Sequence, residues 1–206
     1  MREVIYAARH LQPTHVVQIG DCFDFYNFSR FPTSLEVCKP SDELESGKSM
    51  ANHMWREIQK ACEAKCFQAW GNHEERATKM IMRQAPALEA LLKIKDPLTY
   101  LMTFPGVQTL HSPLDELQIN DVLFHHGWSC RPGYHVQHFL KNVVHGHTHH
   151  GGVVYLRAGR ETLFELDCGV LADFNARPMV YRNSATSKWT TGFGWVDSWG
   201  PRFCPL

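Results

Sequence analysis

The sequence carries no excess of charge of either sign. Lys and Arg together number 21, as do Asp and Glu, so the formal net charge is +0. A dedicated duplex-DNA-binding domain usually has a basic face, so this composition disfavours that class. No apolar run approaches the roughly 18 residues that a membrane helix needs, and no signal-peptide core follows Met1. We therefore expect a soluble protein without a membrane partner.

The cysteines follow neither a disulfide pattern nor a zinc-binding pattern. Seven are present, an odd number, and no two are separated by only two residues. Cys62 and Cys66 are four residues apart, but no second pair at zinc-ligand spacing accompanies them. We therefore expect reduced thiols, a cytoplasmic location, and core packing for Cys62 and Cys66.

What the sequence does contain is enough apolar material for a core and an unusual number of histidines. A chain of 206 residues, 44% of them hydrophobic, suits a single domain over 1–206 with one sizeable core. The 13 histidines include clusters at 125–126 and 145–150. Because imidazole is the commonest metal ligand, this clustering favours a metal site.

The hydrophobic pattern predicts an α/β chain. Helices are expected over 2–11, 42–64 and 75–93, the last interrupted at Pro86. Short strands are expected at 15–19, 66–70, 106–110, 116–119, 121–125, 143–144, 153–157 and 162–166. Residues 27–41 are loop-like, and the tail over 183–206 has no clear periodicity.

The long helix has the clearest signals. Asp42 with Glu45 three residues later is a capping-box arrangement, so Asp42 is the expected N-cap. Its expected core stripe consists of Met50, Met54, Ile58 and Ala61.

Four of the predicted strands end in side chains that bind metal ions. The first is followed by Gly20-Asp21 with Asp24, and the second by Gly71-Asn72-His73-Glu74. The third ends at His125-His126-Gly127, and the fourth leads into Gly146-His147-Thr148-His149. Strand ends are where α/β sheets present functional groups, so we interpret the four as one sheet that delivers one site.

These residue types suit phosphoester hydrolysis. Two metal ions can neutralise the phosphate oxygens and generate hydroxide near neutral pH. Asp21 could bridge both ions, while Asn72 and the histidines His126, His147 and His149 hold borderline metals such as Mn, Fe, Zn or Ni without cancelling their charge. His73 would donate a proton to the leaving group, and Asp24 would orient His73 and raise its pKa.

The series G-D-x-x-D, G-N-H-E, H-G and G-H-x-H resembles the calcineurin-like metallophosphoesterase superfamily. Four stretches are similar to a compact subgroup of this superfamily that is common in bacteriophages and prophages: "VVQIGDCFDFYNFSRF", "GNHEERATKMIMRQAP", "VVHGHTHHGG" and "WTTGFGWV". The resemblance covers most of residues 2–195. It implies a two-sheet α/β sandwich flanked by helices, hydrolysis of phosphomonoesters or phosphodiesters, and a bacterial or phage-infected cell.

The resemblance also implies a role for each matching residue. Asp21 would be the bridging carboxylate, with Asn72, His126 and His147 completing the second metal site and His149 belonging to the first. Asp24 and His73 would form the acid dyad.

Other residues near the motifs leave alternatives open. His125 is an alternative to His126, although the family places its ligand directly before the glycine. His145 and His150 would be neighbours of the site rather than ligands. Arg76 and Arg131 are candidate phosphate-binding residues, and ordinary surface placement is equally compatible with the sequence.

The chain departs from the family pattern at its start. Members of the family begin with a strand ending in Asp-x-His, which supplies two ligands of the first metal, and no such strand precedes Arg2. The second ion is therefore expected to bind firmly through Asp21, Asn72, His126 and His147. The first, left with Asp21 and His149, is expected to bind weakly or not at all.

Three explanations of this departure compete. The chain is N-terminally incomplete, or it works with one metal or with ligands from a partner chain, or it is a degenerate scaffold. The intact remaining motifs argue against degeneration.

The sequence thus favours hydrolysis of a phosphoester by metal-activated hydroxide, with His73 as general acid. Nucleotides or single-stranded nucleic acids are the expected substrates, because the neutral charge disfavours a duplex tracked along its backbone. The alternative is a non-catalytic, metal-stabilised module or pseudo-enzyme in a larger assembly such as a phage particle. The aromatic tail (Trp189, Phe193, Trp195 and Trp199) suggests an oligomer interface or a base-stacking surface, although burial in the core is favoured.

Overall fold

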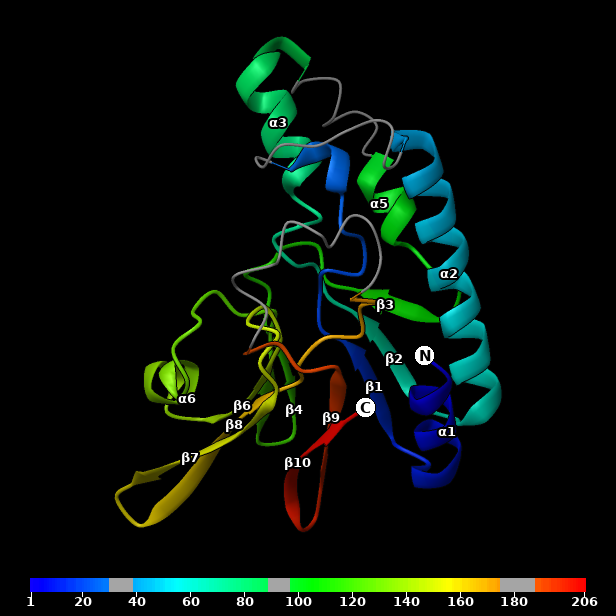
Figure 1. Cartoon of the computed structure of the whole chain (residues 1–206). Coiled ribbons are helices and arrows are strands. Elements are labelled where there is room, and N and C mark those ends of the chain that lie inside the picture. The colour runs from blue at the N-terminus through cyan, green and yellow to red at the C-terminus, as the bar shows by residue number, and fades with distance from the viewer. Residues whose placement is uncertain (30–38, 89–96, 175–187) are drawn as a thin grey trace. The chain divides into compact units, whose positions relative to one another are not determined.

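The computed structural model describes residues 1–29, 39–88, 97–174 and 188–206. They form an α/β chain that divides into two compact units, Met1–Ser112 and Pro113–Leu206, called unit 1 and unit 2 below (Figure 1). The single-domain expectation stays a prediction. Among the described residues, no helix is both long and apolar enough to cross a membrane. The six cysteines described are all free thiols.

Unit 1 is built on a three-stranded parallel sheet. Its strands are β1 (His15–Gln18), β2 (Lys65–Gln68) and β3 (Val107–Thr109), in the order β1-β2-β3. Its longer helices are α1 (Arg2–Leu11), α2 (Pro40–Ala61), α3 (Arg76–Gln84) and α5 (Pro97–Met102), with short 3-10 turns η1 (Tyr26–Phe28) and η2 (Pro86–Leu88). Figure 1 shows α1 and α2 side by side along the sheet.

Helix α2 forms the core of unit 1 through a stripe that differs in part from the predicted one. Ala51, Trp55, Ile58 and Ala61 are buried, whereas Met50 is 60% exposed, so its predicted burial is wrong. Met54, also predicted, packs partly buried against this core, and Trp55 is the largest buried side chain of the helix.

The start of α2 also differs from the prediction. The N-cap is Lys39 and Pro40 occupies the first turn, so the N-cap role of Asp42 is wrong. Proline is favoured at this position because its missing N–H needs no helical partner there. Asp42 instead lies in the first turn, where its charge complements the helix dipole.

Unit 2 contains a mixed five-stranded sheet and a hairpin. The sheet has the order β4-β5-β6-β8-β7, formed by β4 (Leu117–Ile119), β5 (Val122–Phe124), β6 (Asn142–His145), β8 (Glu161–Asp167) and β7 (Gly152–Ala158). Helix α6 (Tyr134–Phe139) connects β5 to β6, which pair in parallel. The antiparallel hairpin of β9 (Gly192–Asp197) and β10 (Gly200–Pro205) lies in the tail that showed no periodicity.

The interpretation of one sheet carrying all four motifs is wrong. Strands β1 and β2 belong to the three-stranded sheet, whereas β5 and β6 belong to the five-stranded sheet. The expected loop over 30–38, the helical stretch over 89–93 and the tail segment 183–187 lie outside the described residues.

Candidate functional site

In unit 1, the two loops that follow β1 and β2 bring four predicted site residues to one end of the sheet. Because β1 and β2 are neighbouring parallel strands, their carboxyl ends meet there. Asp21 and Asp24 lie on the first loop, and Asn72 and His73 on the second. The Asp21 carboxylate (Oδ1) accepts a hydrogen bond from the His73 backbone N–H at 3.0 Å, which joins the loops.

The closeness of the loops explains Gly71. A Cβ atom at this position would clash with the Asp21 carboxylate and lie 2.5 Å from the Asp21 backbone nitrogen. Asp21 itself has φ +55, a left-handed conformation that non-glycine residues adopt rarely. The backbone is therefore shaped to hold the Asp21 carboxylate at this point.

Glu74 is the residue that holds the two loops together, a role that the sequence analysis missed. It is fully buried, and its carboxylate accepts three backbone N–H bonds: from Asp21 at 3.0 Å, Phe23 at 3.1 Å and Gly71 at 2.7 Å. Burial and the nearby Asp21 carboxylate raise the pKa of Glu74 to about 7. We call this arrangement the Glu74 clamp, because one buried carboxylate binds the backbones of both loops.

A chain of hydrogen-bonded side chains supports the first loop from the core. Trp55 Nε1 donates to Gln68 Oε1 at 3.1 Å, and Gln68 Nε2 donates in turn to Gln18 Oε1. The Gln18 side chain then bonds both the N–H and the carbonyl of Gly20 at 2.9 Å. The turn that carries Asp21 is therefore tied to helix α2 through three side chains.

Asp24, His73 and Arg76 form a hydrogen-bonded group. His73 Nδ1 lies 3.1 Å from Asp24 Oδ1, and His73 Nε2 lies 3.6 Å from Asp21 Oδ2. Arg76 donates to the Asp24 carbonyl at 2.7 Å, to Asp24 Oδ1 at 3.2 Å, and to His73 Nε2. The Asp24 bond orients the imidazole, as an acid dyad requires. The Arg76 guanidinium lies on this dyad, and its predicted phosphate contact stays a prediction.

In unit 2, His126 and His147 turn ring nitrogens toward each other. His126 Nε2 lies 3.4 Å from His147 Nδ1, and the rings are nearly perpendicular, at 81°. Two imidazole nitrogens that bind one ion at about 2.1 Å in tetrahedral geometry lie about 3.4 Å apart. The pair therefore fits two adjacent positions around a divalent ion such as Mn, Fe, Zn or Ni.

The loop that carries His147 and His149 has an unusual backbone. Both residues have positive φ, +67 and +64, with Thr148 between them. The Thr148 hydroxyl donates to Asp167 Oδ2 at the end of β8 and accepts from the His150 N–H at 3.1 Å. Thr148 thereby fixes the loop to the sheet. The His149 ring packs edge-on against Trp189, with ring centres 4.3 Å apart.

His125 points into a different environment from His126. It is buried among the rings of Trp128, His135, Phe139 and His145. Burial and the neighbouring imidazoles lower its pKa to about 3. His126, and not His125, is the residue that lies against His147.

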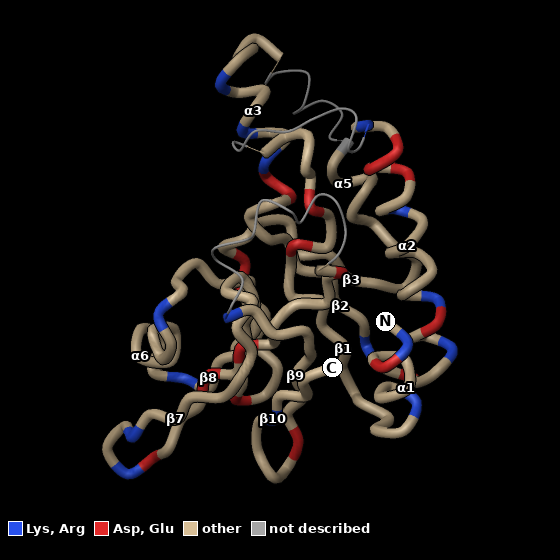
Figure 2. The backbone as a smooth tube through the Cα atoms, viewed as in Figure 1, with Lys and Arg blue, Asp and Glu red and all other residues tan. Residues whose placement is uncertain are grey.

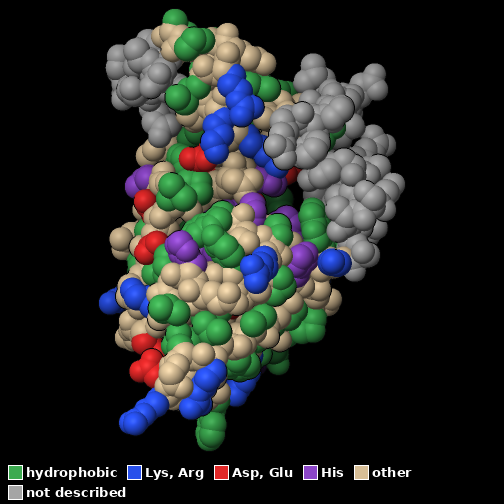
Figure 3. Space-filling view, turned by 90° about the vertical axis from the view of Figure 1, so that its left-hand side faces the viewer, with side chains coloured by type: hydrophobic (Ala, Val, Ile, Leu, Met, Phe, Trp, Pro, Cys, Tyr) green, Lys and Arg blue, Asp and Glu red, His purple; other side chains and the backbone are tan. Residues whose placement is uncertain are grey.

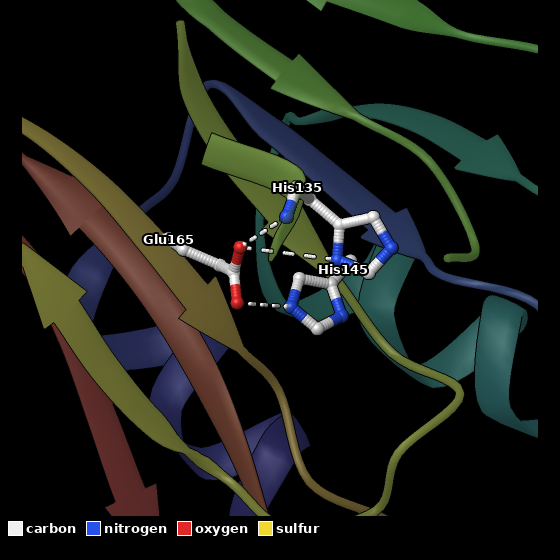
Figure 4. A group of neighbouring side chains, drawn as sticks. All are labelled: His135, His145 and Glu165. Carbon is white, nitrogen blue, oxygen red and sulfur yellow. Dashed lines mark hydrogen bonds and ion pairs between the residues drawn. The ribbon is translucent and has the colours of Figure 1, made fainter. Parts of the chain in front are cut away.

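A buried group of His135, His145 and Glu165 was also missed by the sequence analysis (Figure 4). Glu165 accepts backbone N–H bonds from Gly133 at 2.7 Å, His135 at 2.7 Å and Val136 at 3.0 Å. His145 Nε2 lies 3.4 Å from Glu165 Oε1, and His135 Nδ1 lies 3.8 Å from Glu165 Oε2. The three ligand atoms are near enough to hold a metal ion.

Hydrogen bonding nevertheless favours protons over a metal in this group. His135 Nε2 accepts the backbone N–H groups of Trp128 at 3.3 Å and Ser129 at 3.5 Å, so its proton lies on Nδ1, the atom that a metal would need. Burial lowers the pKa of His145, but hydrogen bonding to Glu165 and the charge of Asp167 outweigh it and raise the pKa. Burial likewise raises the pKa of Glu165, but the bonds from His145 and Val136 lower it to about 2. The group is thus best described as a buried His145–Glu165 ion pair.

The remaining predicted residues lie on the surface or beside the site. Arg131 is exposed, and its backbone takes part in the turn before α6. In the aromatic tail, Trp199 is 85% exposed, against the burial favoured for the tail, whereas Phe193 and Trp195 are half-buried.

Comparison with models of known protein families found no match to the chain, and a search of curated proteins found none. The family resemblance therefore stays a prediction.

Proposed function

We propose that the chain is a metal-dependent phosphoesterase with the calcineurin-like fold, acting on phosphodiesters or phosphomonoesters in the cytoplasm of a bacterial or phage-infected cell. The proposal assigns metal binding to Asp21 and Asn72 of unit 1 and to His126, His147 and His149 of unit 2. The observation that carries it is the position of His73, whose ring nitrogens lie 3.1 Å from Asp24 and 3.6 Å from Asp21. A proton donor is thereby held beside a carboxylate suited to bind metal.

The two sets of residues have complementary chemistry. A bound divalent ion would neutralise the phosphate oxygens and lower the pKa of water. Asp24 would orient the His73 imidazole through Nδ1, leaving Nε2 to deliver a proton to the leaving oxygen. Because Arg76 donates to that same nitrogen, it must release Nε2 when His73 carries the proton there. The position of Arg76 would therefore determine when His73 Nε2 is free to deliver its proton.

The test uses leaving groups of different basicity. For Mn-dependent hydrolysis by His73→Asn, we expect kcat to fall about 10²- to 10⁴-fold with an alkyl leaving group and much less with nitrophenol, which leaves without a proton. Asp21→Asn should lower bound metal as well as activity. His53→Asn, at an exposed histidine of α2, is the matched control and should behave as the parent chain.

The outcomes separate the enzyme from the metal-stabilised module. If His73→Asn lowers kcat equally with both leaving groups, His73 does not act as the general acid. Bound metal without turnover of any phosphoester would support the module. Metal content that is unchanged in both His126→Ala and His147→Ala would contradict the ligand assignment in unit 2.

A further inference from the structure

A cavity in unit 1 opens beside the proposed metal ligand Asn72. Its volume is about 560 Å³. It is lined by Phe28, Ser29, Asn72, Arg76, Lys79, Met80, Arg83 and Gln84. The wall formed by η1 is fixed, because Glu43 of α2 accepts the Tyr26 N–H at 2.6 Å and the Asn27 side chain at 3.1 Å. The cavity is thus bounded by anchored elements on the η1 side and by α3 on the other.

The α3 wall is a basic helical face. Its five lining residues have the spacing i, i+3, i+4, i+7 and i+8, which places them on one side of a helix. Three of them are cationic, and no acidic residue is among the described residues that line the cavity. Figure 2 shows the Lys and Arg positions of α3, and Figure 3 shows such side chains gathered on the face drawn there. The chain therefore has a local basic surface, although its net charge is neutral.

The three cations are not equivalent. Arg76 is half-buried and bonded to Asp24 and His73, so it belongs to the dyad. Lys79 and Arg83 are exposed, and they follow one and two helical turns beyond Arg76, at about 5.4 Å per turn. Lys79 pairs with Glu75, but both are solvent-accessible at i,i+4 spacing, and such pairs are weak and exchange readily.

We propose that this cavity is a subsite for a second phosphate group of the substrate, bound by Lys79 and Arg83 while the scissile phosphate lies at Asn72. The inference rests on the proposed function and adds a substrate class: phosphoesters that carry another phosphate next to the reacting one. Phe28 and Met80 supply apolar surface in the same cavity, which suits a nucleobase. Single-stranded oligonucleotides and nucleoside polyphosphates share this chemistry.

The first test measures binding without catalysis. A fluorescein-labelled oligothymidylate is titrated with the full chain in EDTA, and fluorescence anisotropy is read. We expect Lys79→Gln/Arg83→Gln to bind roughly tenfold more weakly than the parent chain. The slope of log K against log salt should become shallower by about 1.4, since each single-strand phosphate contact contributes about 0.7.

The matched control is Arg56→Gln/Lys60→Gln on α2. It removes the same two charges at the same i,i+4 spacing, and its lysine also pairs with a glutamate of its own helix, Glu57. The control should leave affinity and salt slope as in the parent chain. Equal weakening in the two double variants would overturn the subsite, because it would show a response to net charge alone.

A second arm separates the subsite from the proposed hydrolysis. With Mn, the ratio of kcat/KM for a trinucleotide to kcat/KM for an aryl phosphodiester should fall in Lys79→Gln/Arg83→Gln and stay constant in the control. If the parent chain binds oligonucleotide through these residues but hydrolyses nothing, the subsite stands and the enzyme proposal fails. If it hydrolyses both substrates and the ratio does not change, the subsite alone fails. Competition by thymidine triphosphate against the oligonucleotide assigns the source of the second phosphate.

Discussion

At the scale of single residues, Glu74 and Glu75 show how burial changes the structural role of a carboxylate. The two are adjacent in sequence, yet Glu74 is fully buried under three backbone N–H groups, whereas the Glu75 side chain is 32% exposed and pairs with Lys79. The first carboxylate shapes the backbone of the site, and the second contributes a surface ion pair of small value.

This difference predicts the effect of replacing each carboxyl group by an amide. Glu74→Gln keeps the shape of the side chain but turns an NH₂ group toward backbone N–H donors, so we expect a loss of about 1–3 kcal/mol in the free energy of unfolding. Metal affinity should fall with it, because the Asp21 loop loses its anchor. Glu75→Gln should change neither quantity by more than about 0.5 kcal/mol. Urea unfolding and metal titration of both variants check this, and similar losses in the two would refute the clamp.

Single residues could be singled out from the sequence where their chemistry is distinctive. Asp24 and His73 lie within hydrogen-bonding distance, as an acid dyad needs, because a motif places each directly after a strand. Glu74 and Glu165 escaped notice because a buried carboxylate that accepts N–H bonds looks, in sequence, like any surface glutamate. A glutamate between apolar neighbours, as Glu165 is between Phe164 and Leu166 of β8, was the available signal.

At the scale of elements, most helices and strands were predictable from periodicity, and the failures have local causes. The β9–β10 hairpin was missed because glycines interrupt β9 and weaken any strand pattern. The structure shows why they are there: a Cβ at Gly192 would clash with the Phe203 ring, and a Cβ at Gly194 would lie 2.8 Å from Leu166 Cδ2. The ring needs the space that glycine leaves, a requirement of tertiary packing that periodicity does not record.

The hydrogen-bonded side chains that connect α2 to β1 predict how a substitution changes stability and activity. Gln68→Leu would leave Trp55 Nε1 and the Gln18 side chain without their partner in a buried place, so we expect a loss of about 2–3 kcal/mol in stability. Activity should fall further than stability explains, because Gln18 shapes the Gly20–Asp21 turn. Gln108→Leu, at an exposed position of β3, is the control and should cost less than about 0.5 kcal/mol. Thermal unfolding and assays on folded protein distinguish the two, and a harmless Gln68→Leu would contradict the support role.

At the scale of the whole molecule, the number of sheets could not be read from the sequence. Every short strand that ends in a polar loop looks alike, and pairing partners are set by contacts distant in the chain. Whether β5 pairs with β2 or with β6 depends on those contacts, and the structure pairs it with β4 and β6. Which polar residues follow each strand was therefore predictable, whereas the grouping of strands was not.

The buried histidines of unit 2 predict how the stability of the molecule depends on pH. Burial and neighbouring imidazoles lower the pKa of His135 to about 4 and that of His125 to about 3. In the unfolded chain both histidines titrate near 6.5, so below that pH the unfolded state binds protons that the folded state does not bind. The contribution of these two histidines to stability should be full above pH 6.5 and should fall by about 1.4 kcal/mol per pH unit for each histidine as the pH drops toward 4.

The opposing ion pair acts outside this window. The raised pKa of His145 gives stability that is present below pH 6.5 and lost only as the pH rises through its folded value. The low pKa of Glu165, about 2, gives stability that is lost only below its ordinary value of 4.5. Glu74 acts inside this window in the opposite sense, because its pKa of about 7 makes the folded chain hold a proton that the unfolded chain releases above about 4.5. Urea unfolding in EDTA between pH 6.5 and 5 should therefore show the histidine slope less the opposing contribution of Glu74, and this net slope should be reduced by about one proton in His135→Asn. His138→Asn, at an exposed residue of the same helix, should keep the parent slope, and equal slopes in all three proteins would contradict the assignment.

The Glu74 clamp also has a consequence for motion. The amide protons of Asp21, Phe23 and Gly71 are all held by one carboxylate, although they come from two loops. Solvent can reach any of these amides only when their hydrogen bonds to that carboxylate break. The three amides should therefore exchange with deuterium in a single shared opening. The loops of β1 and β2 therefore breathe together, and a metal ion bound by Asp21 would slow the exchange of all three amides at once.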